Sequence, residues 1–189
     1  TSMKPFRLAG ELTSLFTFGN TLFLQQDYSN LLKYEQGSFN TYLHIPDLKS
    51  PITGVLPTAT DTVVLSTLKH AFFYITNTGQ YGRWSTPHDA LLQEKRIYHA
   101  TQLPDGAFAL GTSLDGTYIL DTSKQLTNHL FKKNGLQNNN VLNTFTDRSG
   151  NLWLGLDNGI ACVVTDAPFS EIIPDGDLQG TGYSASLFN

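Results

Sequence analysis

The chain has 189 residues, of which 40% are hydrophobic and 12% aromatic, so it is long enough to bury a sizeable core and is not disordered. A net charge of −4 with a pI near 5.6 excludes the basic surface that nucleic-acid binding needs, and we expect no nucleic-acid partner. The single cysteine, Cys162, excludes an internal disulfide, and no run approaches the roughly 18 apolar residues of a membrane span, so no membrane contact is expected.

Short runs rich in threonine, aromatic and branched residues alternate along the chain with glycine, asparagine, aspartate and proline, which predicts strands joined by tight turns. The longest helical pattern, residues 89–96, covers barely two turns, so the fold class is all-β. In chain order the predicted units are a tag or connector (1–11), four blades (12–45, 52–86, 96–133 and 141–173), and the start of a truncated blade (174–189).

A repeat supports this division. Leu24, Leu65, Leu110 and Leu154 occupy matching positions, with spacings of 41, 45 and 44 residues. Four strands in each repeat of this length are typical of a β-propeller blade. A β-sandwich is the alternative, because its strands recur at a similar spacing, but it has no reason to repeat the same turn and the same leucine.

The segment 134–160 carries the most regular motif: Asn-Gly-Leu at its start, Asp147 and Gly150 in a turn, Leu-Trp-Leu-Gly at 152–155 and Asn-Gly at 158–159. It resembles the repeat of the two-component regulator propeller family. The resemblance weakens toward the N-terminus: residues 97–121 keep the Asp-Gly and Leu-Gly-Thr elements, with Phe108 in place of the tryptophan. Residues 12–86 match only in length and strand pattern.

Each motif residue has an expected structural role. Asp147 to Gly150 form a hairpin turn in which Gly150 has a positive φ. Trp153 is buried between adjacent blades, and Gly155 leaves room for a neighbouring backbone. An Asn-Gly pair ending at Gly159 forms a type I′ turn. These residues predict the fold and assign no ligand.

The resemblance implies a sensory function. Members of this family are similar to the periplasmic input regions of hybrid two-component histidine kinases of Bacteroidetes, and many respond to products of glycan breakdown; some relatives carry a LuxR-type DNA-binding output. We therefore expect a ligand-sensing fragment of such a sensor, with a small molecule or oligosaccharide as ligand. A scaffold for protein–protein interaction is the alternative, and a glycosidase-type propeller is less favoured.

Four blades fall short of the usual ring, so we expect two open apolar faces and self-association, most simply as a dimer. The run 183–189 adds an unpaired strand. The residues expected on the open faces are Phe16, Phe18 and Leu22 or Phe23 at one end, and Val163 with Ile172 or Ile173 at the other.

Two groups of residues could contact a sugar: Tyr81, Arg83 and Trp84 in a predicted fourth strand, and Tyr98 and His99 in a predicted inner strand. Packing between blades, or a place on an outer surface, is the favoured interpretation for each. No ligand-binding residue is therefore assigned.

No metal or other cofactor is expected. The Asp175-Gly176-Asp177 run lacks the later ligands of a calcium loop and is interpreted as a connecting turn. The histidines have neither pair spacing nor accompanying carboxylates: His44, His70, His88, His99 and His129.

No catalytic residue is expected either. The segment from Asp147 to Trp153 is distantly similar to the Asp-box turn of sialidase-type propellers, but Phe145 stands where that motif has serine or threonine. Glycoside hydrolysis needs two carboxylates that face each other across the substrate. The acidic residues considered lie mostly in turns: Asp105, Asp115, Asp147 and Asp157.

Overall fold

The computed structural model describes residues 7–59 and 61–164, which form four antiparallel sheets. The first sheet contains β1 (Leu12–Phe18), β2 (Thr21–Gln26), β3 (Asn30–Glu35) and β4 (Ser38–His44), and the second contains β5 (Ile52–Ala59), β6 (Thr62–Thr67), β7 (Ala71–Thr76) and β8 (Tyr81–Arg83). The third contains β9 (Ile97–Gln102), β10 (Phe108–Thr112), β11 (Thr117–Leu120) and β12 (Leu126–Leu130), and the fourth contains β13 (Val141–Thr146), β14 (Leu152–Leu156) and β15 (Gly159–Val163). A helix, α1 (Asp89–Lys95), and a 3₁₀ turn at Lys132–Asn134 lie in the connections.

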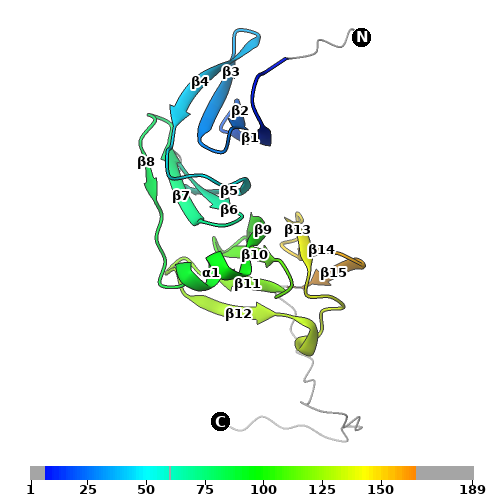
Figure 1. Cartoon of the computed structure of the whole chain (residues 1–189). Helices are drawn as coiled ribbons and strands as arrows, with labels where there is room; N and C mark the ends of the chain where they lie inside the picture. Colours follow the sequence, from blue (N-terminus) through cyan, green and yellow to red (C-terminus); the bar gives the residue numbers. More distant parts are fainter. Residues whose placement is uncertain (1–6, 60, 165–189) are drawn as a thin grey trace, which may run out of the picture.

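Each sheet is a meander in which strands follow their order in the chain, and the four sheets succeed one another along an arc (Figure 1). We number them blades 1 to 4. The first strands, β1, β5, β9 and β13, lie on the inner side of the arc. This arrangement confirms the β-propeller fold, and the sandwich alternative is wrong. Blade 4 has three strands among the described residues; the last part of the predicted blade 141–173 and the run 174–189 lie outside them.

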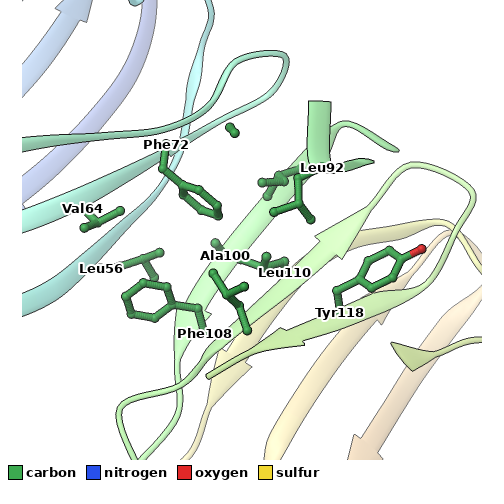
Figure 2. Close-up of a cluster of buried hydrophobic side chains, with 11 residues drawn as sticks. Leu56, Val64, Phe72, Leu92, Ala100, Phe108, Leu110 and Tyr118 are labelled. Atoms are coloured by element: carbon green, nitrogen blue, oxygen red, sulfur yellow. The ribbon is translucent and has the colours of Figure 1, made fainter. Parts of the chain in front are cut away.

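A separate apolar core fills each space between neighbouring blades. Leu31, Val63, Leu65, Phe73 and Ile75 are among the buried residues between blades 1 and 2. Figure 2 shows the core between blades 2 and 3, where Leu56, Val64, Phe72, Phe108 and Leu110 converge with the helix residue Leu92. Leu103, Ala109, Val141, Leu152 and Leu154 belong to the core between blades 3 and 4. Burial of these faces is the main force that holds the blades together.

The second strand of each blade shows a common register. Leu65, Leu110 and Leu154 pack toward the preceding blade, which agrees with their assigned equivalence. The residue before each repeated leucine points toward the opposite face of its blade, because side chains alternate across a strand. These residues are Phe23, Val64, Ala109 and Trp153.

This register corrects the alignment of Phe108 with the motif tryptophan. Ala109, not Phe108, occupies the tryptophan position, since both Ala109 and Trp153 immediately precede the repeated leucine. Phe108 points back toward blade 2, whereas Ala109 packs against blade 4. The prediction was therefore out of register by one residue.

The predicted open faces also need correction. Phe16 and Phe18 pack against the core shared with blade 2, and Phe23 is only 4% exposed, so these rings do not form an outer face. Val163 packs toward blade 3. Ile172 and Ile173 lie outside the described residues. The apolar side chains exposed on the far side of blade 4 are instead Phe145, Trp153 and Ile160.

Candidate functional site

A cavity lies on the inner side of the arc, between β1, β5 and β9. It has a volume of about 620 Å³, which falls within the range typical of small-molecule sites. Residues 14–17, 52–55 and 98–101 line it, one stretch from each of three blades. We call this cavity the inner channel.

The lining of the inner channel combines apolar surface with free hydroxyl groups. Leu15 is 62% exposed and Tyr98 41% exposed. The side chains of Thr17, Thr101 and Tyr98 form no hydrogen bond to another residue of the described chain. A ring beside free hydroxyls suits a ligand with both apolar and hydroxylated faces.

Glycine allows two inner strands to approach each other in this channel. A Cβ at Gly54 would lie 2.7 Å from the carbonyl oxygen of Ala100, a distance that no side chain tolerates. Ser14 also connects two blades, since its Oγ donates a hydrogen bond to the carbonyl oxygen of Ile52 at 2.6 Å. The channel walls are therefore fixed by contacts between backbones rather than by long side chains.

His99 connects the inner strands of blades 3 and 4. Its Nδ1 accepts a hydrogen bond from the backbone N–H of Thr144 at 3.3 Å and lies 3.0 Å from the Thr144 hydroxyl. An acceptor Nδ1 requires the neutral imidazole with its proton on Nε2. Burial lowers the pKa of His99, which also favours the neutral ring. The position of Tyr98 and His99 in an inner strand agrees with the sequence prediction.

The other predicted group is divided by the structure. Trp84 packs against the core between blades 2 and 3, whereas Tyr81 is 43% exposed on the outer strand β8. Arg83 donates a hydrogen bond to the carbonyl oxygen of His70 at 2.7 Å, and its guanidinium lies 4.7 Å from the centroid of the Phe73 ring. These three residues do not share one site.

The Asp147 turn is present as predicted, and Gly150 has a φ of 87°. The Asp147 carboxylate accepts hydrogen bonds from the backbone N–H groups of Ser149 and Asn151, at 2.8 and 3.0 Å, and from Trp153 Nε1 at 2.9 Å. The Trp153 indole is the main cause that lowers the pKa of Asp147, followed by the Asn151 side chain. The Asp147 carboxylate therefore stabilises the hairpin turn. Its lowered pKa keeps it ionised, so it does not carry the proton that a catalytic acid donates.

The predicted burial of Trp153 is wrong for the described residues, because its side chain is 40% exposed. It lies beside Phe145 and Cys162 on the face of blade 4 that points away from blade 3. No described blade follows on that side. The register of Trp153 matches that of interblade residues in the other blades, but no described residue covers its side chain.

Two further motif residues differ from expectation. The loop between β14 and β15 consists of residues 157 and 158, and only Gly159 has a positive φ, of 152°, so the turn is not of type I′. A Cβ at Gly155 would lie 3.5 Å from Asn143, an ordinary contact. At the equivalent Gly111 a Cβ would lie 2.7 Å from Val141, so the close approach occurs there.

Metal binding finds no support in residues 7–59 and 61–164, where no three His, Cys, Asp or Glu side chains come together. The Asp175-Gly176-Asp177 run lies outside the described residues. Cys162 is exposed. Within the described segments, neither helix is long and apolar enough to cross a bilayer.

Sequence reasoning found Tyr98 and His99 but missed the channel residues from β1 and β5, including Leu15, Thr17 and Gly54. The repeat itself could have identified these residues, because the first strand of every blade is the inner one. Residues of β1 and β5 at the positions of Tyr98 and His99 are therefore expected in the channel.

No protein-family model and no curated protein matches the chain. Solved structures do. The extracellular domain of BT4673, described as a hybrid two-component system of B. thetaiotaomicron, is 23% identical with a TM-score of 0.58, over 80% of this chain and 21% of that one. The corresponding domain of BT3049 from the same organism is 17% identical with a TM-score of 0.63, over 79% of this chain and 21% of that one.

An enzyme also shares the fold: a catalytically inactive variant of virginiamycin B lyase from Staphylococcus aureus, in a structure with quinupristin. It is 14% identical with a TM-score of 0.63, over 90% of this chain and 58% of that one. The chain spans about a fifth of the length of the two Bacteroides domains. These likenesses show that the chain has the β-propeller fold found in the extracellular domains of hybrid two-component systems.

Proposed function

We propose that this chain is part of the ligand-sensing, periplasmic input region of a bacterial two-component sensor histidine kinase and is itself non-catalytic. Its ligand is a small, glycan-derived molecule that binds in the inner channel. The fold likeness to two extracellular sensor domains supports the first statement. The observation that carries the second is the 620 Å³ channel lined by Tyr98 and free threonine hydroxyls.

The channel suits an oligosaccharide on chemical grounds. The Tyr98 ring offers an apolar face to the C–H side of a pyranose, and the hydroxyls of Thr17 and Thr101 can donate to or accept from sugar hydroxyls. Because the lining comes from three blades, a bound sugar would contact all three. That arrangement would couple occupancy of the channel to the positions of the blades.

Thermal denaturation against a library of oligosaccharides tests this proposal, since a ligand that binds only the folded chain must raise its Tm. We expect at least one compound to raise Tm in the wild-type chain and to have no effect on Tyr98→Ala. Tyr81→Ala is the matched control, because Tyr81 is 43% exposed but does not line the channel. If Tyr98→Ala keeps the full response, the ligand binds elsewhere.

The exposed face of blade 4 favours the second candidate, a scaffold that binds protein. Phe145 is 62% exposed, Ile160 69% and Trp153 40%, and all three belong to the sheet face that points away from blade 3. A second copy of the chain is the simplest partner, which gives a dimer. Light scattering tests it: a mass near 20.9 kDa at all concentrations would contradict self-association.

A further inference from the structure

Two equivalent turns differ at one residue. The β7–β8 turn (76–80) and the β11–β12 turn (121–125) have the same backbone hydrogen bonds, and their fourth residues have φ angles of 84° and 64°. The fourth residue is Gly79 in blade 2 but Lys124 in blade 3. Glycine adopts this left-handed conformation without penalty, whereas a lysine there is strained.

The Lys124 ammonium lies over the ring of Trp84, 4.2 Å from the centroid, and donates a hydrogen bond to the carbonyl oxygen of Ser85 at 3.0 Å. Phe72 and Phe108 hold the indole, with centroids 5.4 and 5.7 Å away; Figure 2 shows both rings in the core between blades 2 and 3. An ammonium carries three N–H donors, and the described residues accept from only one of them.

This ammonium borders a pocket of about 330 Å³ between blades 2 and 3, which shares no lining residue with the inner channel. Asp121 lines the same pocket, and one of its carboxylate oxygens accepts a hydrogen bond from the backbone of Gln125 at 2.8 Å. The other oxygen has no partner among the described residues, and Asp121 and Lys124 form no ion pair with each other. The pocket is therefore lined by two residues of opposite charge, each with hydrogen-bonding capacity that the described residues leave unused, and by two aromatic residues, Trp84 and Phe108.

We propose that this pocket binds a small zwitterion, an α-amino acid with an apolar side chain. Its carboxylate contacts the Lys124 ammonium, its ammonium contacts the free oxygen of Asp121, and its side chain lies against Trp84 and Phe108. Hydrogen bonds between charged groups are stronger than neutral ones, so the two ends fix the ligand's orientation. Aromatic walls with a few convergent polar groups are typical of small-molecule sites.

Isothermal calorimetry with the 189-residue chain and three compounds tests each contact separately. L-phenylalanine has both charges, phenylalaninamide lacks the carboxylate, and hydrocinnamate lacks the ammonium. We expect phenylalanine to bind and each analogue to bind roughly tenfold more weakly, the loss that one charge-assisted hydrogen bond implies. Equal binding of all three compounds, or no binding of any, would overturn the proposal.

Two variants assign each charge to its residue. Lys124→Gly restores the glycine that blade 2 has at this position, and Asp121→Asn keeps a side-chain oxygen for the turn, so both are expected to fold. Lys124→Gly should bind phenylalanine and its amide equally, while Asp121→Asn should bind phenylalanine and hydrocinnamate equally. Variants that keep the wild-type preferences would show that neither charge contacts the ligand.

Discussion

Blades 1 and 4 have an aromatic pair at equivalent positions, but the pair is packed against a neighbouring blade only in blade 1. In blade 1 the cross-strand pair Phe16–Phe23 points toward blade 2, with ring centroids 5.6 Å apart, and Phe23 is 4% exposed. In blade 4 the equivalent pair is Phe145–Trp153, and its side chains are 62% and 40% exposed. The register is identical, so a blade carries half of an interface whether or not a described neighbour completes it.

The largest expected difference between these two regions comes from Phe23→Ala and Trp153→Ala. Phe23→Ala should lower the free energy of unfolding by about 3–5 kcal/mol, the usual loss for a buried aromatic. Trp153→Ala should cost less than half as much, because part of its ring already contacts solvent. Urea denaturation measures both. Equal losses would mean that Trp153 is covered in solution.

The polar contacts of the first interface give the next prediction. Gln25 is fully buried; its Nε2 donates to the carbonyl oxygen of Ser50 at 2.8 Å, and its Oε1 accepts from the N–H of Ile52 at 2.9 Å. Gln25→Leu leaves these buried backbone groups without partners and should cost about 2–4 kcal/mol in chemical denaturation. Gln26→Leu is the control, since the Gln26 amide bonds to Ala9 in an exposed position. Similar losses for both variants would contradict the role given to Gln25.

A smaller effect is expected at the repeated glycine. Gly111→Ala puts a Cβ within 2.7 Å of Val141 in blade 4 and should cost about 1–3 kcal/mol. Gly155→Ala meets only Asn143 at 3.5 Å and should be nearly neutral. Thermal denaturation of the pair compares a blade with a described neighbour and one without. A strong effect at Gly155 would show that another backbone packs there in solution.

The smallest effect concerns acid stability and Asp147. Because the folded-state pKa of this carboxyl is lowered, it stabilises the fold at pH values above its unfolded pKa, near 4. That contribution is lost as the pH falls through the lower, folded pKa. Asp147→Asn should therefore reduce Tm at neutral pH and flatten the decline of Tm below about pH 4. Parallel pH profiles for variant and wild type would rule out this role.

The sequence was sufficient for the repeat, the strand order and the Asp147 turn, because these depend on local pattern and turn chemistry. The sequence did not predict the burial of side chains correctly where that burial depends on residues of a neighbouring blade. The sequence predicts that Trp153 is buried between blades, but such burial needs a contact from another blade, and no described residue covers this side chain. Phe108 was misaligned because an aromatic ring was matched by type rather than by its distance from the repeated leucine.

The candidate sites were only partly accessible to sequence reasoning. Tyr98 and His99 were found as aromatic residues in an inner strand, while Leu15 and Thr17 have ordinary strand composition and carry no signal of their own. Lys124 is the clearest omission. Nothing in its local sequence marks a left-handed lysine, and only alignment of its turn with the one that contains Gly79 reveals the substitution.

Every complete blade is built from four consecutive strands, and none borrows a strand from elsewhere in the described chain. Most of the pairings that a blade needs therefore span few residues, which favours rapid folding. As in other repeat proteins, folding can begin in any blade and spread to its neighbours through the shared cores. Adding or removing a whole blade would therefore leave the order of the strands within every other blade unchanged.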